Sequence, residues 1–154
     1  MAEPNLPCKP NSPLLLQRFL PYRLTTLSNK ISQALAAQYS ERFDLSIPEW
    51  RIVAVLGEGV ALSAAEIVQR TAMDKVAVSR AVKKLLEKGR LEKNQDTNDN
   101  RRFALSLSEA GKTLYEEVVP IALDYEKRLI AQLNHEEIDN MDKLFNHLDS
   151  VILK

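Results

Sequence analysis

Residues 74–102, DKVAVSRAVKKLLEKGRLEKNQDTNDNRR, contain the signals that decide the fold. A helix-patterned stretch rich in Lys and Arg runs to Gly89, and two short extended segments follow it at 90–95 and 102–107. The tip between these segments, 96–100, consists of Asp, Asn and Thr, which are turn-forming residues, and Arg101 follows it. This order predicts a recognition helix followed by a β-hairpin wing, an arrangement suited to gripping a DNA duplex.

The distribution of charge supports the same interpretation. The 154 residues include 21 basic and 21 acidic side chains, so the net charge alone does not indicate a nucleic-acid partner. Residues 74–90, however, carry six basic and two acidic side chains, whereas residues 108–154 carry five basic and ten acidic ones. We therefore expect a positive field confined to one helix, as a DNA footprint requires, and an acidic C-terminal third that avoids phosphate.

Composition and motifs argue against several other classes of protein. No apolar run approaches the roughly 18 residues of a membrane span, and no signal peptide is visible, so we expect a cytoplasmic protein without membrane contact. The single cysteine, Cys8, excludes an internal disulfide and a multi-cysteine metal site. No nucleophile-elbow, Walker or dinucleotide-binding motif occurs, so we expect neither an enzyme nor a cofactor.

A proline-rich start and a long amphipathic segment precede the basic helix. Residues 1–13 contain four prolines, which predicts a flexible or extended arm. Between Leu14 and about Tyr39 apolar residues recur at helical spacing, so we expect a helix that Pro21 bends or divides.

Two capping boxes mark the next helices. In each box a Ser is followed three residues later by a Glu, and the two serines are Ser46 and Ser63. The first helix is expected to end at Gly57 and the second at about Thr71, and a short turn then leads to the basic helix, which Asp74 caps. Two short helices joined by a tight turn, the second one basic, are typical of a helix-turn-helix.

Two further helices are expected after the wing. Ser108 caps a long helix that reaches about Leu133 and that Pro120 disturbs, and a last helix begins at His135. The terminal helices carry more apolar surface than a small DNA-binding lobe can cover. This excess predicts a homodimer in which helices of two chains cover one another.

With these elements in this order, the chain resembles the MarR family of bacterial transcription regulators from about Leu14 to Leu148. Four strings carry the resemblance: IPEWRIVAVL (47–56), LSAAEIVQRTAMDKVAVSRAVKKLLEKG (62–89), DTNDNRR (96–102) and LSLSEAG (105–111). The resemblance implies a mainly α-helical fold with a small β-hairpin wing in a single domain, 14–154. Its winged helix-turn-helix, 46–107, would lie between dimerisation helices at 14–45 and 108–154.

The resemblance also implies a homodimeric transcription factor, most simply a repressor, on a pseudo-palindromic operator. The residues expected to contact DNA are Lys75, Ser79, Arg80, Lys83, Lys84, Asp99, Arg101 and Arg102. Arg80 suits a guanine edge or a phosphate, and Arg101, oriented by Asp99, suits a narrow minor groove. Asn98 departs from the family's wing pattern, which commonly has Arg there. A solvated lysine face and a solvated hairpin tip remain the alternatives.

Members of the family sense small aromatic or phenolic acids between the DNA lobe and the dimerisation helices. The corresponding candidates here are Arg18, Tyr22, Arg23 and Trp50. An Arg beside aromatic rings can hold both a carboxylate and the ring attached to it. Alternatively, Trp50 belongs to the core, the two arginines pair with acidic residues of the dimer, and the regulator takes no ligand.

Two other functions remain as alternatives. A redox-sensing regulator would use Cys8, although this residue lies between Pro7 and Pro10, away from a helix N-terminus that would lower the pKa of its thiol. A winged helix used for protein–protein contact would have a recognition helix poor in positive charge. The basic composition of residues 74–90 favours DNA instead.

Overall fold

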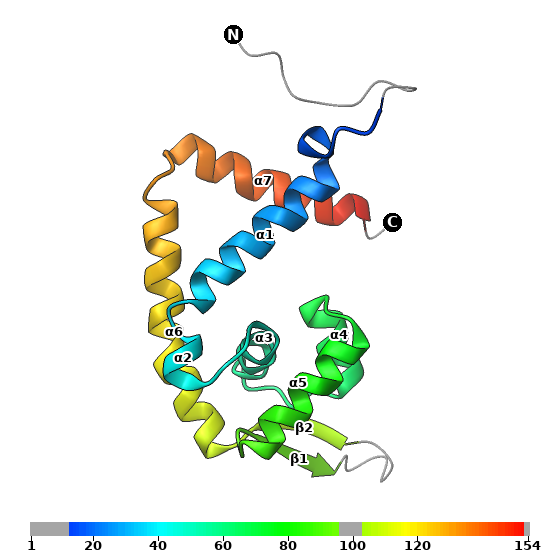
Figure 1. Ribbon diagram of the computed structural model, residues 1–154, viewed down its shortest axis with the longest axis vertical. Helices are drawn as coiled ribbons and strands as arrows, with labels where there is room; N and C mark the ends of the chain where they lie inside the picture. Colours follow the sequence, from blue (N-terminus) through cyan, green and yellow to red (C-terminus); the bar gives the residue numbers. More distant parts are fainter. Residues whose placement is uncertain (1–12, 96–102, 153–154) are drawn as a thin grey trace.

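The computed structural model describes residues 13–95 and 103–152, and the predicted mainly α-helical fold with a small hairpin is confirmed (Figure 1). In chain order the elements are a 3-10 turn (Leu16–Arg18), α1 (Leu20–Ala36), α2 (Ser40–Phe43), α3 (Ile47–Leu56), α4 (Ala64–Thr71), α5 (Lys75–Glu87), β1 (Leu91–Gln95), β2 (Phe103–Leu107), α6 (Glu109–Ile130) and α7 (His135–Ile152). The predicted arm, apart from Pro13, and the wing tip, 96–102, lie outside the described residues.

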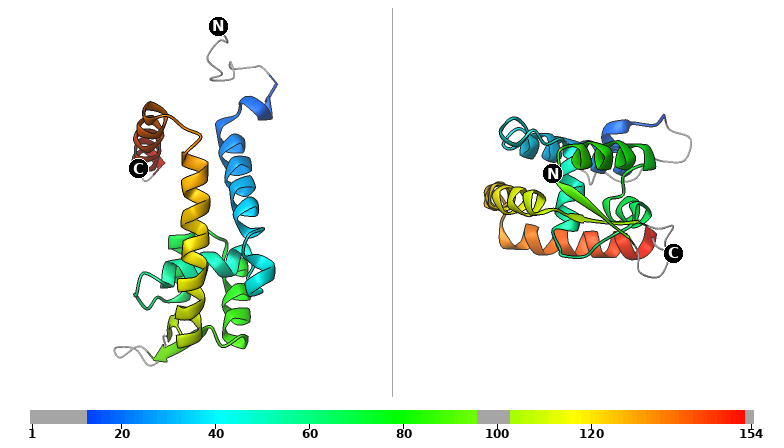
Figure 2. Two further views of the ribbon diagram at one scale, coloured as in Figure 1. Left: turned by 90° about the vertical axis from the view of Figure 1, so that its left-hand side faces the viewer. Right: turned by 90° about the horizontal axis from the view of Figure 1, so that it is seen from below.

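The molecule consists of a compact lobe from which long helices extend. α3, α4, α5 and the hairpin form the lobe, α1 and α6 rise from it, and α7 lies across the far end of α6 (Figures 1 and 2). The core lies in the lobe, where Ile52, Ile67 and Leu85 are fully buried. By contrast, no described residue of α7 is buried, and α1 buries only Ala36. No helix in the described ranges is long and apolar enough to cross a lipid bilayer.

Local capping signals predicted the helix starts of the lobe correctly. Both capping boxes are complete, because Ser46 and Ser63 each accept the N–H of the Glu three residues on, and that Glu accepts the serine N–H. Asp74 caps α5 by accepting the N–H of Ala77 at 2.9 Å, and Ser108 caps α6 by accepting the N–H of Gly111 at 3.0 Å.

The proline interpretations need correction. Pro21 neither bends nor divides a helix that starts at Leu14, because it lies in the first turn of α1, where its missing N–H costs no hydrogen bond. A 3-10 turn precedes α1 and continues the apolar spacing that suggested one longer helix. Pro120 lies inside α6, which nevertheless remains one helix to Ile130.

The end of α1 also differs from the prediction. This helix stops at Ala36 rather than at about Tyr39, and the short helix α2 follows. Tyr39 and Phe43, at the start and end of this second segment, are both buried in the lobe. A four-residue helix shows no periodicity in a sequence, so its presence follows from packing rather than from a local pattern.

The wing is fixed to the lobe at its base. β1 and β2 pair antiparallel with Leu91 opposite Leu107 and Lys93 opposite Leu105. Leu62, in the segment between α3 and α4, forms a further bridge: its N–H donates to the Leu105 carbonyl at 3.0 Å and its carbonyl accepts at 2.7 Å. This isolated bridge joins the base of the hairpin to the segment between α3 and α4.

The turn between α4 and α5 places an alanine in a strained backbone conformation. Ala72 has φ +52° and ψ +26°, the left-handed region that a Cβ disfavours by roughly 1–2 kcal/mol. Because glycine lacks this penalty but loses more entropy on folding, we expect Ala72→Gly to raise the free energy of unfolding by about 0.5–1 kcal/mol. Urea unfolding at fixed protein concentration measures the change.

Ala65 provides the control, since it is exposed on the helix α4 and needs no special backbone geometry. We expect Ala65→Gly to lower the free energy of unfolding by about 0.5–1 kcal/mol. Equal losses in the two variants would show that Ala72 is not strained.

Candidate nucleic-acid interface

α5 has one face in the core and another in solvent. Val78, Ala81 and Leu85 are buried, and their three- and four-residue spacing places them on one side of the helix. All the residues of α5 predicted to contact DNA are exposed: Lys75, Ser79, Arg80, Lys83 and Lys84. The helix is thus held by an apolar side and presents a side of four cations and a hydroxyl, which we call the basic face.

Most of the charge on the basic face is uncompensated. Among the residues that the structure describes, only Lys83 of the four cations has an ion-pair partner, Glu87, at 3.8 Å. Both side chains of this pair are more than half exposed, so the pair contributes little to stability. A surface whose other three cations have no ion-pair partner within the described ranges attracts a polyanion and leaves these cations available to phosphates.

A groove of about 420 Å³ runs beside the basic face. Arg80 and Lys84 line it from α5, and Ser46 and Pro48 line it from the start of α3. The capping box and Pro48 fix this start of α3, so the far wall of the groove is a rigid element. With Lys83, which also lines the groove, three cations of the basic face therefore border an open groove between the two helices.

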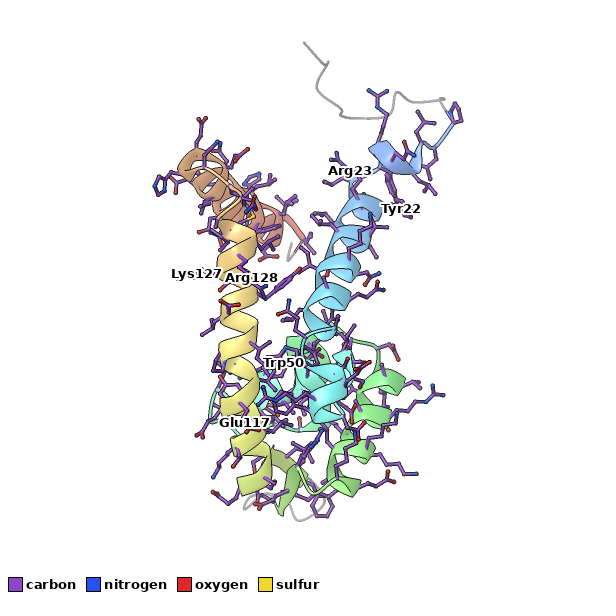
Figure 3. All side chains as sticks on the ribbon, turned by 60° about the vertical axis from the view of Figure 1, so that its left-hand side comes forward. Tyr22, Arg23, Trp50, Glu117, Lys127 and Arg128 are labelled. Carbon is purple, nitrogen blue, oxygen red and sulfur yellow. The ribbon has the colours of Figure 1, made fainter. Side chains whose placement is uncertain are left out.

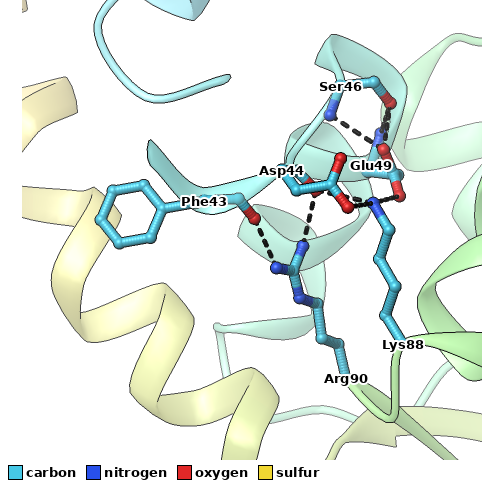
Figure 4. A network of polar contacts seen from close by, with 6 residues as sticks. All are labelled: Phe43, Asp44, Ser46, Glu49, Lys88 and Arg90. Carbon is cyan, nitrogen blue, oxygen red and sulfur yellow. Dashed lines mark hydrogen bonds and ion pairs between the residues drawn. The ribbon is translucent and has the colours of Figure 1, made fainter. Parts of the chain in front are cut away.

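Two of the six basic residues in 74–90 do not belong to the basic face. The Lys88 ammonium donates to the Glu49 carboxylate at 2.9 Å and to the Asp44 carbonyl at 2.6 Å, and the Asp44 carboxylate lies 3.0 Å away (Figure 4). The Arg90 guanidinium donates to the carbonyls of Asp44 and Phe43 (Figure 4). The positive field predicted for the whole segment is therefore narrower than expected and rests on the basic face alone.

Glu49 is the centre of this network, and its side chain is only 2% exposed. Burial alone would raise the pKa of Glu49, but hydrogen bonds from Ser46 and from Lys88 outweigh burial and leave that pKa below its ordinary value. The Ser46 N–H donates to Glu49 at 2.8 Å, and the Lys88 ammonium donates at 2.9 Å. The charged carboxylate thus joins the start of α3 to the end of α5. Sequence reasoning found its capping role but not Lys88, 39 residues away.

The predicted wing residues Asp99, Arg101 and Arg102 lie outside the described residues, so their DNA contacts remain predictions. The described part of the hairpin shows how the base of the wing is attached to the lobe. Leu105 and Leu107 are buried against the lobe, and the Asn94 amide donates to the Ser106 hydroxyl at 2.7 Å across the strands. The hairpin is thus a braced support beside α5.

Comparison with known proteins agrees with this geometry. The model of the MarR family matches residues 43–102, which include α3, α4, α5 and β1. A solved MarR/EmrR family transcriptional regulator from Acinetobacter sp. ADP1 is 32% identical and superposes with a TM-score of 0.81 over 90% of this chain and 98% of that one. This chain belongs to the MarR family. Its members are transcriptional regulators, not enzymes.

Two further known proteins are similar to this chain. The HTH-type transcriptional regulator TcaR of Staphylococcus aureus is 26% identical to this MarR-family chain over 115 residues, covering 73% of this chain and 76% of that protein. The fold also matches Bordetella bronchiseptica BpsR, whose DNA binding is regulated by 6-hydroxynicotinic acid, with a TM-score of 0.77. The BpsR sequence is 20% identical to this one, and the match covers 90% of this chain and 98% of that chain.

The structure does not bring the four predicted effector residues of this MarR-family protein together within one chain. Tyr22 and Arg23 are exposed near the N-terminal end of α1, just after Arg18 in the 3-10 turn, whereas Trp50 lies in the lobe (Figure 3). Arg23 and Ala36 are 13 positions apart in α1, which corresponds to about 20 Å of helix. A single pocket formed by all four residues of one chain is therefore absent from the described structure.

Trp50 instead belongs to an aromatic cluster that sequence reasoning missed. Its ring stacks on Tyr115 of α6 with centroids 6.4 Å apart and contacts Tyr39 at 5.8 Å. Burial raises the pKa of Tyr39 to about 12. A Cβ on Gly57 would overlap the Tyr115 ring, so this glycine serves close packing rather than a left-handed helix end. The cluster joins the lobe to α6.

The Glu49 network predicts an acid-sensitive fold. The lowered pKa of Glu49 means that its contribution is complete above the ordinary value of 4.5 and is lost as pH falls through the folded-state value. We expect Glu49→Gln to lower the free energy of unfolding by about 2 kcal/mol at pH 7, because Lys88 loses a buried partner. The difference in free energy of unfolding between Glu49→Gln and the wild type should become smaller below pH 4.5.

Urea unfolding at pH 7 and at pH 3.5 (roughly one unit below the ordinary glutamate value) measures this difference. Glu41→Gln, at an exposed position of α2, is the control and should change stability by less than about 0.5 kcal/mol. If the difference in free energy of unfolding between the wild type and Glu49→Gln were the same at both pH values, the stabilising role of the charged Glu49 carboxylate would be refuted.

Proposed function

We propose that this MarR-family protein is a homodimeric repressor that binds a pseudo-palindromic DNA site and leaves it when a small aromatic acid binds. The observation that carries the DNA part of the proposal is the basic face of α5. Its cations are exposed opposite the buried stripe of Val78, Ala81 and Leu85, so the helix can enter a major groove without disturbing the core.

Each residue of the basic face has a role in this proposal. Arg80, in the second turn of α5, pairs with a guanine edge, because its two parallel N–H groups match the O6 and N7 acceptors. Lys75, Lys83 and Lys84 hold phosphates, and Ser79 contacts a phosphate or a base edge. At the wing, Arg101 enters the minor groove with support from Asp99, and Arg102 contacts the backbone.

The exposed apolar surface of the terminal helices supports the dimer. Leu27 on α1, Leu123 on α6 and Phe145 on α7 are 55%, 58% and 48% exposed. Large apolar side chains that are about half exposed on all three helices are candidates for contact with a partner. A second copy of the chain covers these faces in the proposed dimer, and its two copies of α5 would then meet half-sites about 34 Å apart.

The effector proposal has two candidate locations. Trp50 and the aromatic cluster connect the lobe to α6, whereas Arg18, Tyr22 and Arg23 lie at the N-terminal end of α1. Support for an aromatic acid comes from the resemblance in fold to BpsR, which responds to 6-hydroxynicotinic acid. Such a ligand can release DNA only if it binds the released conformation better than the DNA-bound one.

A salt series of DNA titrations tests the DNA-binding role. We use a duplex selected from a random library. The logarithm of the affinity for this duplex should fall linearly with the logarithm of the salt concentration, because phosphate contacts release counterions. We expect Arg80→Ala to lower affinity by about 10- to 100-fold and to relax the preference for the selected sequence. Lys84→Ala should weaken binding to all sequences alike and reduce the salt slope by about one for each phosphate that the lysine neutralises.

Lys112→Ala is the control, since Lys112 lies on α6 and pairs with Glu109 at 2.6 Å. It should leave affinity and slope unchanged. Binding that does not weaken with salt would argue for the protein–protein alternative. So would an Arg80→Ala variant that equals the wild type in affinity for the selected duplex and for random duplexes.

Calorimetric titration with salicylate and 6-hydroxynicotinic acid tests the effector. We expect an acid of this class to bind the protein and to lower the protein's affinity for the selected duplex by about fivefold or more. Trp50→Leu and Arg23→Ala, examined separately, should identify which location holds the acid, because only the variant in the occupied site loses the heat of binding. If neither acid binds and neither affects DNA, the protein is a ligand-independent regulator or uses another signal.

A further inference from the structure

The middle of the basic face contains an apolar side chain. At about 100° per residue, Val76, Arg80 and Lys83 fall close to one line along α5 on the side opposite Leu85 in the core, and Ser79 lies beside this line. Lys75 and Lys84 lie on the two flanks of this line. The residue that points farthest from the core in the first turn of α5 is therefore a valine between cations.

This valine lies outside the hydrophobic core of the described residues. Val76 is 57% exposed. In the described part of the lobe the other large apolar side chains with similar exposure are Val60 at 47% and Phe103 at 54%. Phe103 lies under the Lys93 ammonium, 6.0 Å from its ring centroid, and Val60 belongs to the segment between α3 and α4. Val76 is thus the exposed apolar residue of the basic face itself.

Helix stability does not explain a valine at this position. A β-branched residue loses side-chain freedom in a helix and is less favourable there than alanine by roughly half a kcal/mol. Exposure also means that Val76 gains little from burial in the lobe. Single exposed apolar residues are common on protein surfaces, so what distinguishes Val76 is its place among the residues proposed to contact DNA.

We propose that Val76 reads the C5-methyl group of a thymine in the major groove. The inference rests on the proposed function, because it requires α5 to enter that groove. The N-terminal residues of a recognition helix meet the base edges, and the thymine methyl is the apolar feature of the major-groove pattern. Val76 lies one turn before Arg80, so the thymine lies within a few base pairs of the guanine that Arg80 reads.

Replacement of thymine by deoxyuridine tests this contact, because it removes the methyl group and keeps every hydrogen-bonding group. The full-length protein is titrated against its selected duplex, and each thymine is replaced in both half-sites in turn. At one symmetric position we expect the affinity of the wild type to fall about three- to fivefold per half-site. Val76→Ala should show no such fall there and should bind the unmodified duplex as weakly as the wild type binds the substituted one.

Val60→Ala is the matched control, since it shortens the other exposed valine of the lobe. It should retain the deoxyuridine sensitivity of the wild type at every position. Val76→Thr, which keeps one methyl in the same shape, should retain part of it. Urea unfolding of Val76→Ala should show stability equal to or slightly above that of the wild type, which separates a missing methyl contact from a damaged fold.

Identical deoxyuridine profiles for the wild type and Val76→Ala would overturn the inference, as would a wild type that is insensitive at every thymine. Either result, obtained with salt-dependent binding intact, leaves the proposed DNA-binding function standing. A wild type that selects no duplex at all would contradict both.

Discussion

The ion pair between Glu49 and Lys88 determines how α5 is held in the lobe. It joins the start of α3 to the residue after α5, and Ser46 keeps the carboxylate charged through two hydrogen bonds. The core holds one side of α5, and the buried Glu49 carboxylate, which must stay paired, also holds the end of this helix. The direction in which the basic face points therefore depends on one carboxylate whose partners all lie within the fold.

The end of α5 is also joined to the long helix that leaves the lobe. The Ser108 hydroxyl, at the cap of α6, donates to the Gly89 carbonyl at 2.7 Å, and the Ser108 N–H donates to the Arg90 carbonyl at 3.2 Å. Gly111 faces the same Arg90 carbonyl so closely that an added Cβ would overlap it. A movement of α6 therefore reaches α5 through a few short, stiff contacts. Such a connection is what a signal between the terminal helices and the DNA lobe requires.

The sequence was sufficient where structure depends on neighbouring residues, and insufficient where distant residues meet. Asp74 and Ser63 marked helix starts because a cap and its N–H partner are three residues apart. Glu49 with Lys88 and Leu62 with Leu105 are 39 and 43 positions apart, and no local pattern links them. For the site, helical periodicity separated the exposed cations of α5 from its buried residues correctly. Periodicity could not show that Lys88 forms an ion pair within the fold, because its position in the sequence resembles that of the other lysines.

The unequal neutralisation of charge along α5 has a kinetic consequence. Lys88 and Lys83 face Glu49 and Glu87, whereas Lys75, Arg80 and Lys84 have no ion-pair partner in the described structure. The positive field is thus concentrated on the exposed side of α5, and a polyanion that approaches by diffusion turns the molecule so that this side arrives first. Encounters with a duplex are oriented before any base edge is within reach, and higher ionic strength reduces this advantage in the rate of association.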